Sequence, residues 1–450
     1  MAHPDPIRET LSRLKAKGLH RRLVALGSAA GTHVEVGGRS VLQFASNNYL
    51  GLANDPRVKE AARKAIERWG WGAGASRLVS GHTEAHAALE ADLAAFEHTE
   101  AALVFPTGYM ANLGVVTALA GRGDVVVMDR ASHASLYDAA RLAGARLARY
   151  PQGDAEAAAK LLAADSRAAA LLSHRARPRK RGGSGDPPPR PRAGKEKSAR
   201  TGRRLLATDT VFSMDGRTAP LAELADLCRL ENAMLVLDEA HAIGVLGPTG
   251  AGLAEELGVA DGVTAAVGTL SKALGGIGGF VAASRQVCAL LVNRARPFIY
   301  TTALPAAACE AARAALAIVR AEPERRRRLL DLARRLRTRL REEGFDIGLE
   351  KGEKRGHSAF STGTQTGHRQ AQGQKVECPL FETPIIPVIL GDPRRALAFA
   401  AALLEEGIFC PAIRPPTVPA GTSRLRVSLT AEHTDEDLDR LVSALVRIRC

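Results

Sequence analysis

The sequence predicts an α/β protein in which a mainly parallel sheet forms a large domain and a smaller α+β domain follows it. Short apolar runs alternate with stretches of helical periodicity over the first two thirds of the chain, a pattern typical of β-α-β units. These runs are continuously apolar, as expected for parallel strands covered on both faces. At 450 residues the chain is long enough for two domains with buried cores.

The first 45 residues are expected to form a helix and a hairpin. Residues 8–25 have the periodicity of an amphipathic helix, and apolar runs at 34–36 and 41–44 flank Gly37 and Gly38, which suit a tight turn. The large domain is then expected over residues 46–285 and the C-terminal domain over 286–450.

Helices in the large domain are expected at 56–69 and 84–97, where apolar and charged positions alternate at helical period. The expected strands are the short apolar runs at 101–105, 124–129, 168–172, 204–208, 235–238 and 265–268. Beyond residue 285 the pattern predicts one long helix at 305–343, a strand at 385–390, a helix at 393–406, a strand at 424–429 and a last helix at 434–448.

Two segments lack the residues needed to build a core. Residues 173–204 hold twelve Lys and Arg against two Asp and Glu, and residues 350–380 are polar and rich in Gly, Gln and Thr. The first is expected to be a disordered insert and the second a flexible insert. Most of the net charge of +14 therefore belongs to one insert, which argues against a folded face that binds nucleic acid.

The most informative motif pairs a lysine with an acid about thirty residues upstream. Lys272 follows Thr269 in a loop of small residues, and Asp238 ends the apolar run 234–237. A loop lysine can form a Schiff base with a carbonyl cofactor, and an acid at a strand end can keep a pyridinium nitrogen protonated. A surface lysine and a loop acid are the alternatives, but the combination favours pyridoxal phosphate.

Nine motifs in order strengthen this interpretation. They are Asn47–Leu52, Gly72–Arg77, Ser80–His82, Thr107–Tyr109, Ser132–Ser135, Val211–Gly216, Asp238–His241, Thr269–Lys272 and Arg414–Pro419. Together they resemble the α-oxoamine synthase family of fold-type I pyridoxal phosphate enzymes, from about residue 10 to the C-terminus with the two inserts as interruptions. The resemblance implies the fold-type I transferase fold, with a sheet of the seven-stranded type and pyridoxal 5'-phosphate as cofactor.

The resemblance also implies the roles of individual cofactor residues. Lys272 matches the Schiff-base lysine and Cα base, and Asp238 matches the partner of the ring nitrogen. His133 matches the imidazole stacked on the ring, although a buried structural histidine is the alternative from the residues alone. The other matches are His241 near the ring hydroxyl, Ser213 as a site hydroxyl, and Gly108, Tyr109 and Thr269 at the phosphate.

The same resemblance implies which residues bind the substrates. Arg426 and Arg21 match arginines that meet substrate carboxylates, and His133 and Thr417 match substrate-site residues. A surface helix arginine is the alternative for Arg21. Thr302, after Thr301, matches a hydroxyl that reaches the phosphate of a neighbouring subunit, which implies a homodimer.

The motifs are most similar to family members of biotin synthesis. Their resemblance implies decarboxylative condensation of L-alanine with a pimeloyl thioester, on coenzyme A or acyl carrier protein. Glycine C-acetyltransferase and 5-aminolevulinate synthase are alternatives within the family, because fold and cofactor are shared. An inactive scaffold and a basic nucleic-acid binder are the alternatives outside it.

Composition bears on compartment and metals. The six cysteines are scattered without a C-x-x-C pair, so no zinc site or disulfide framework is expected. No charge-free apolar run reaches about 18 residues, and residues 1–5 do not resemble a secretory signal. A cytoplasmic enzyme without a membrane span is expected.

Overall fold

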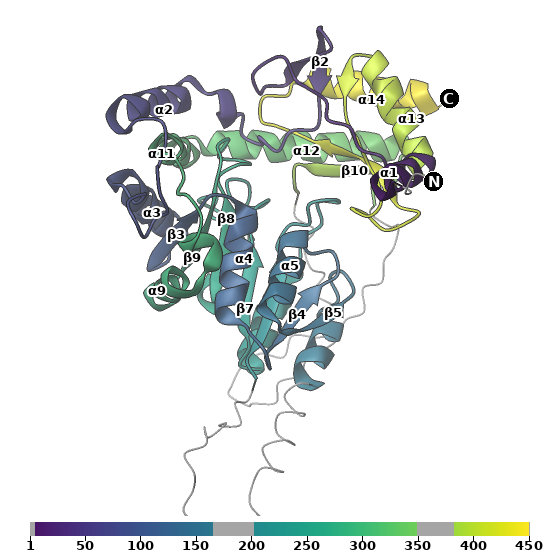
Figure 1. Ribbon diagram of the computed structural model, residues 1–450. Coiled ribbons are helices and arrows are strands. Elements are labelled where there is room, and N and C mark those ends of the chain that lie inside the picture. Colours follow the sequence, from purple (N-terminus) through teal and green to yellow (C-terminus); the bar gives the residue numbers. More distant parts are fainter. Residues whose placement is uncertain (1–4, 165–201, 349–381, 450) are drawn as a thin grey trace, which may run out of the picture.

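A computed structural model of the protein describes residues 5–164, 202–348 and 382–449 (Figure 1). The expected strand at 168–172 and the insert at 350–380 lie outside these residues, as does most of the insert at 173–204. The expected end of that first insert was wrong. Arg203 pairs with Asp124 at 2.9 Å, and Arg204 begins a sheet strand. Among the described residues, no helix is both long and apolar enough to cross a membrane.

A seven-stranded sheet forms the centre of the large domain. Its strands are β3 (Ala101–Phe105), β4 (Val125–Asp129), β5 (Arg146–Tyr150), β6 (Arg204–Asp209), β7 (Met234–Asp238), β8 (Ala265–Thr269) and β9 (Gly279–Ala283). Their order is β3-β9-β8-β7-β6-β4-β5, and only β9 runs antiparallel to its neighbours. The expected mainly parallel sheet is confirmed. Strands β5 and β9 were not foreseen, because arginines interrupt the first and a glycine run precedes the second.

Side chains of successive strand residues enter separate cores on the two faces of the sheet. In β4, for example, Val125 and Val127 pack in one core and Val126 and Met128 in the other. Helices α4 (Gly108–Leu119), α5 (Ala134–Ala143), α9 (Arg285–Arg294) and α10 (Arg296–Ile299) cover the second core, and α4 and α5 stand in front of the sheet in Figure 1. Both faces are therefore buried, which explains the continuous apolar runs.

The first core is covered by α3 (Glu84–Phe96), α7 (Leu221–Leu230) and α11 (Ala306–Ala321). The remaining elements of this part are η1 (Leu52–Asn54), α2 (Pro56–Trp69), a helix over residues 155–164, α8 (Leu253–Glu256) and η2 (Ala260–Gly262). Helices α9 and α10 follow the domain boundary expected at residue 285 but pack on the large sheet.

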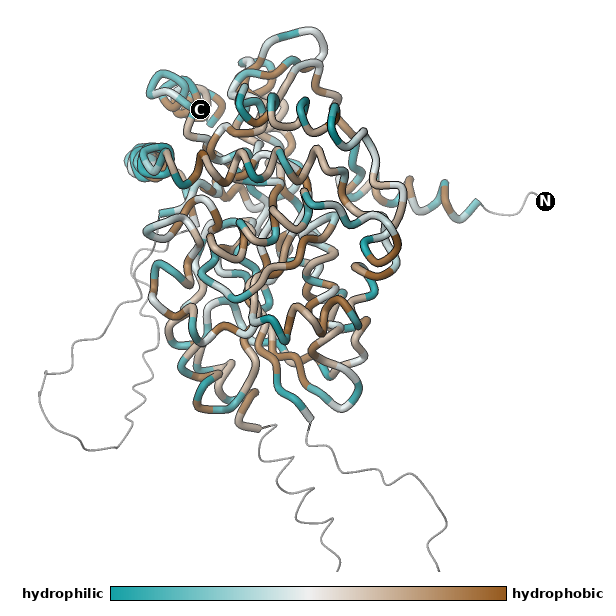
Figure 2. The backbone as a smooth tube through the Cα atoms, turned by 90° about the vertical axis from the view of Figure 1, so that its left-hand side faces the viewer, coloured by the Kyte–Doolittle hydropathy of each residue, from teal (hydrophilic) through white to brown (hydrophobic). Residues whose placement is uncertain are grey.

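The N-terminal helix is shorter than expected. Helix α1 spans Pro6–Ala16 and not 8–25, and none of its residues is buried. Gly18 takes a left-handed conformation with φ +64°, which suits the end of a helix, and the chain then runs without helix to a bridge between Leu26 and Val36. Figure 2 shows α1 projecting from the body. Periodicity alone overstated its length because no packed face extends the helix.

The small domain combines distant parts of the chain. It contains α12 (Pro323–Glu342), β10 (Ile385–Gly391), α13 (Pro393–Glu405), β11 (Ile408–Phe409), β12 (Ala412–Ile413), β13 (Ser423–Ser428) and α14 (Asp435–Arg449). Strand β13 lies between β10 and β12 in an antiparallel sheet. The N-terminal hairpin, β1 (His33–Val36) and β2 (Arg39–Gln43), is confirmed, and β2 pairs with β11. The N-terminal segment is thus tied to the C-terminal domain.

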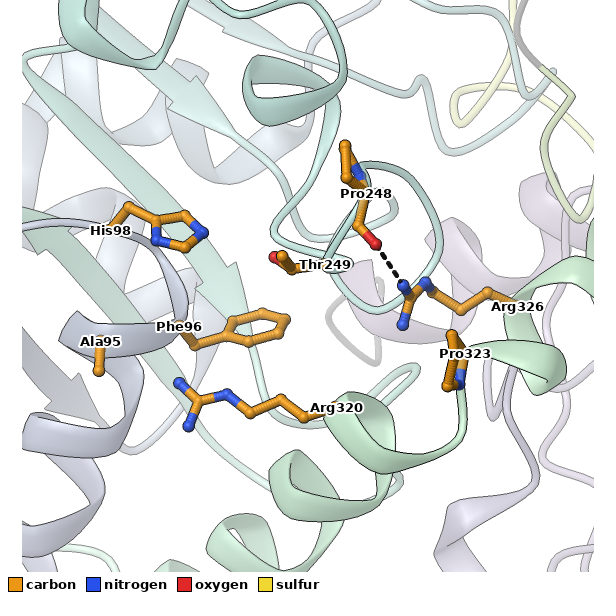
Figure 3. Close-up of a pocket in the computed structure, with 8 residues that line it drawn as sticks. All are labelled: Ala95, Phe96, His98, Pro248, Thr249, Arg320, Pro323 and Arg326. Atoms are coloured by element: carbon orange, nitrogen blue, oxygen red, sulfur yellow. Dashed lines mark hydrogen bonds between the residues drawn. The ribbon is translucent and has the colours of Figure 1, made fainter.

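The long helix expected at 305–343 is divided into α11 and α12 at Pro323. Proline has no N–H, so it cannot donate to the carbonyl of Val319 four residues earlier. The buried guanidinium of Arg326 donates to that carbonyl instead, through Nη1 at 2.9 Å, and its Nη2 donates to the carbonyl of Pro248 at 2.9 Å. Arg326, Pro248 and Pro323 line a hollow between α3 and the α11–α12 junction (Figure 3). Arg326 therefore joins the helix break to the glycine-rich loop at 247–252.

Candidate active site

A cavity of about 220 Å³ opens at the carboxyl ends of the central strands. Asp209, Asp238 and Thr269 are the last residues of β6, β7 and β8, and all three line it. Strands of a parallel sheet end at one edge, which is why residues far apart in the sequence meet here. The other lining residues are Thr107, Gly108, Tyr109, Asn112, His133, Ala240, His241, Val267, Gly268, Ser271 and Lys272.

The carboxylate of Asp238 is buried and held on both oxygens. Oδ2 accepts a hydrogen bond from Nδ2 of Asn112 at 2.6 Å, and Oδ1 accepts one from the backbone N–H of Ala240 at 3.0 Å. The neighbouring Asp209 is also buried, and the loss of water together with the charge of Asp238 raises the pKa of Asp209 well above its usual range. The site therefore presents one firmly oriented acid at its floor.

Lys272 lies in the turn between β8 and β9. Removal from water lowers the pKa of its amine to about 8, against the attraction of Asp238 and Asp209. Among the described residues, no hydrogen-bond partner holds its Nζ. A half-buried lysine with a lowered pKa is suited to attack a carbonyl and to carry a proton.

The amino end of α4 forms another wall of the cavity. Thr107 caps this helix by accepting from the N–H of Met110 at 3.1 Å, which leaves the amides of Gly108 and Tyr109 at the helix start. Thr269 Oγ1 lies 2.7 Å from Ser271 Oγ on the adjoining turn. Amides and hydroxyls at a helix start favour an anion such as phosphate.

A close approach of backbones builds this wall. A Cβ on Gly279, the first residue of β9, would lie 2.5 Å from the amide nitrogen of Gly108. Glycine at 279 is therefore needed for β9 to pack beside the start of α4. The glycine run after Lys272 thus has a steric function.

His133 is fixed at the amino end of α5. Its backbone N–H donates to Oδ1 of Asp209 at 2.9 Å, and its Nδ1 lies 2.7 Å from Oγ of Ser135. Burial lowers the pKa of the imidazole, so the ring is neutral at neutral pH. The ring of Tyr109 stands edge-on to it, with centroids 6.5 Å apart.

On the other side of the cavity, His241 begins a network that leads to Arg426. Nδ1 of His241 lies 2.7 Å from the hydroxyl of Tyr49, which also contacts Oδ1 of Asn47 at 3.1 Å. Nη2 of Arg426 donates to the same Asn47 oxygen at 3.0 Å. Burial and the charges of Lys272 and Arg426 hold the pKa of His241 well below its usual range. The network places a cation close to the cavity, and within residues 5–164, 202–348 and 382–449 no acidic side chain pairs with it.

The remaining predicted residues lie outside the cavity wall. The carbonyl of Ser213 accepts from Nε of Arg426, so Ser213 belongs to the arginine side. Arg21 donates from Nη2 to Oγ1 of Thr417 at 3.3 Å, although they are 396 positions apart. Thr302 is exposed, and its backbone bridges that of Ser76. The structure thus pairs Arg21 with Thr417 and leaves Thr302 apart from the cavity of its own chain.

Sequence comparison agrees with this geometry. The chain matches the family "Aminotransferase class I and II" over residues 39–356 and 365–445. The chain belongs to this family. It is 47 % identical over 444 residues to the 8-amino-7-oxononanoate synthase of Anaeromyxobacter dehalogenans (strain 2CP-1), covering 99 % of this chain and 95 % of that protein. Relatives that are 42 to 44 % identical carry the same name.

Solved structures extend the comparison. The serine palmitoyltransferase of Sphingomonas wittichii is 30 % identical, with a TM-score of 0.80 over 99 % of this chain and 96 % of that chain. The serine palmitoyltransferase of S. paucimobilis, solved with bound PLP, is 29 % identical, with a TM-score of 0.80 over the same shares of the two chains. These likenesses confirm the fold-type I architecture.

The residues that line the cavity of this protein are suited to hold pyridoxal phosphate. An oriented carboxylate, Asp238, suits a ring nitrogen, and the start of α4 with Thr269 suits the phosphate. Lys272 lies within the same cavity, and His133 is a neutral ring on its wall. Asp238 thus offers the negative charge that suits a protonated ring nitrogen, and the helix start offers hydrogen-bond donors that suit a phosphate.

Asn112, Asp209 and Tyr49 are among the site residues that were not assigned a role from the sequence. Asn112 and Asp209 lie in an apolar helix and at a strand end, where neither forms a motif, and Tyr49 belongs to a quoted motif that carried no assigned role. An isolated polar residue inside an apolar helix, such as Asn112 in α4, was the available signal.

Proposed function

We propose that this protein condenses L-alanine with a pimeloyl thioester to give 8-amino-7-oxononanoate, carbon dioxide and a free thiol. The observation that carries this proposal is the intact cavity of Lys272, Asp238, His133 and His241 in a chain that is 47 % identical along 99 % of its length to a protein of that name. In the balanced reaction the alanine Cα gives up its proton and bonds to the acyl carbon, and the thiolate that leaves takes up a proton to become the free thiol. The alanine carboxylate then leaves as carbon dioxide, and a proton returns to Cα in its place.

Pyridoxal phosphate supplies the capacity to spread negative charge away from the substrate Cα when it is bound. Asp238 holds its ring nitrogen protonated, and the amides of Gly108 and Tyr109 bind its phosphate. Lys272 anchors it covalently. The pKa of about 8 lets the Lys272 amine exist in both protonation states near neutral pH, as a group that takes a proton from Cα and returns it must.

Two arginines are placed to bind the carboxylates of the substrates. Arg426 is bound to Asn47, Ser428 and the carbonyl of Ser213, and none of these neutralises its charge. It is thereby oriented to receive the amino-acid carboxylate. The pair of Arg21 and Thr417 offers a second cationic position, suited to the distal carboxylate of a pimeloyl chain.

The active form is proposed to be a homodimer. Val79 and Tyr300, which flank the bridge between Ser76 and Thr302, are 79 % and 69 % exposed. Exposed apolar side chains grouped beside one position are typical of subunit contacts. In a dimer Thr302 is available to the phosphate of the second site.

Assays with the purified protein test the substrates. L-alanine with pimeloyl-CoA and with pimeloyl acyl carrier protein should yield 8-amino-7-oxononanoate, identified by mass. Glycine with acetyl-CoA, and serine with palmitoyl-CoA, test the alternatives suggested by the family and by the structural relatives. The Lys272→Ala variant is the control for background reaction. A product from either alternative pair, but none from L-alanine with either pimeloyl thioester, would refute the proposal.

A further inference from the structure

Three buried polar side chains beside the cavity, those of Asn112, Ser135 and Asp238, form a hydrogen-bonded network with the more exposed His133. Nδ2 of Asn112 lies 2.6 Å from Oδ2 of Asp238 and 2.9 Å from Oγ of Ser135. Oγ of Ser135 in turn lies 2.7 Å from Nδ1 of His133. These hydrogen bonds link Asp238 of β7 to the imidazole of His133 at the start of α5 through Asn112 of α4. None of the motifs that identify the family accounts for this link.

The orientation of the Asn112 amide follows from its partners. An ionised carboxylate only accepts hydrogen bonds, so the nitrogen of the amide must face Asp238. Both N–H groups are then used, one toward Asp238 and one toward Ser135. The amide oxygen is buried and, among the described residues, has no hydrogen-bond partner. An unpaired buried oxygen is disfavoured, so the fold accepts a cost to direct both donors at the site.

The same hydrogen-bond network determines which ring nitrogen of His133 carries the proton. Because the Ser135 hydroxyl accepts from Asn112, its own proton is available for Nδ1 of His133. The backbone N–H of Ser135 also points at this nitrogen, at 3.4 Å. Two donors on Nδ1 require it to be an acceptor, so the ring proton resides on Nε2.

We propose, on the basis of the function proposed above, that Asn112 is a positioning residue that orients the Asp238 carboxylate and, through Ser135, holds His133 as the Nε2–H tautomer. One residue of α4 thereby orients both the acid that would hold the ring nitrogen and the imidazole that lines the same cavity. Burial also lowers the pKa of His133, which favours the neutral ring that this arrangement needs.

Nitrogen NMR of the protein with 15N-labelled histidine tests the tautomer directly. In the cofactor-free and the cofactor-loaded protein, the His133 signals, assigned with His133→Gln, should show an unprotonated Nδ1 and a protonated Nε2. Ser135→Ala should shift them toward a mixture of tautomers, while the signals of buried His433, bound to Gln43, stay in place. Protonated Nδ1 in the wild type, or no change in Ser135→Ala, would overturn the proposal.

Cofactor binding tests the link to Asp238. Asn112→Ala should weaken binding of pyridoxal phosphate by about tenfold or more, since a hydrogen bond to a buried carboxylate is lost. It should also lower the pH at which the bound ring loses its proton, read from the absorbance spectrum. Asn112→Ser, which keeps one donor, should recover part of both effects. Thr117→Ala, which removes a hydroxyl bonded only within α4, is the matched control.

The two experiments separate this proposal from the proposed function. Neither requires a substrate, so an incorrect assignment of the thioester would leave their outcomes unchanged. If Asn112→Ala does not fold, the Ser135→Ala spectra still decide the tautomer. Cofactor affinity within twofold of wild type in Asn112→Ala, with an unchanged pH titration, would show that Asn112 has no positioning role.

Discussion

The amine of Lys272 in the cofactor-free protein should titrate near pH 8 instead of near 10.5. Removal from water lowers its pKa to about 8, which outweighs the attraction of Asp238 and Asp209. At pH 7 about a tenth of such an amine is neutral, compared with about 0.04 % for a lysine with an ordinary pKa near 10.4. The reactive neutral form is thus about 200-fold more abundant at position 272.

Competitive labelling measures this difference. Cofactor-free protein is treated with a trace of an acylating reagent between pH 6 and 11, and the peptides are quantified by mass. Labelling of Lys272 should rise to a plateau above pH 8. Lys160 is an internal control, because its hydrogen bond to Glu156 raises its pKa. Labelling at 272 that still increases tenfold per pH unit between 9 and 10 would refute the reasoning.

The same shift predicts how stability depends on pH. The folded pKa lies below the unfolded one, so folding disfavours the protonated amine below about pH 8. Between pH 8 and 10.5 the folded chain has released this proton and the unfolded chain retains it, so the free energy of unfolding rises with pH. The upper limit is about 3–4 kcal/mol, since the pKa differs by about 2.5 units at about 1.4 kcal/mol per unit. The difference between the Lys272→Met variant and the wild type should change by up to this amount across that range in urea unfolding; a constant difference would contradict the shift.

Three further predictions concern other parts of the molecule. Asp238→Asn keeps the shape of the side chain but removes the charge that faces the ring nitrogen, so kcat should fall about 100-fold or more. The thermal transition should also fall, because the new amide N–H cannot accept the hydrogen bond that Asn112 or Ala240 donates to the carboxylate. Arg426→Lys loses the planar fork that binds Asn47 and Ser428, so the KM for L-alanine should rise about tenfold with a smaller change in kcat; an unaltered KM would remove Arg426 from the carboxylate site. Arg326→Met removes the donors to two carbonyls and should lower the free energy of unfolding by about 2–4 kcal/mol without altering kcat. The control is Arg327→Met at an exposed position, which should change the free energy of unfolding by less than about 0.5 kcal/mol.

The sequence pattern predicted the strands correctly where a strand is a continuous apolar run buried on both faces of a sheet. Strands β3, β4, β6, β7, β8, β10 and β13 were expected within a residue or two of their bounds. Strand β5 was missed because Arg146 and Arg149 point away from the core. Helix α1 was overextended because none of its own residues is buried and the chain turns out of the helix at Gly18, where φ is +64°. The split of α11 from α12 had a visible cause, Pro323, which the helical period concealed.

The sequence by itself determined the chemistry available to this protein: a lysine, an acid, two histidines and a glycine-rich loop in the order that pyridoxal phosphate enzymes share. These follow from residue type and spacing, which are properties of the chain. Only the tertiary structure decided how those groups are held. Asn112 binds Asp238, Tyr49 binds His241, and Arg21 meets Thr417 across 396 positions. Such contacts depend on which strand ends and helix starts converge at one edge of the sheet, and no local pattern encodes that convergence.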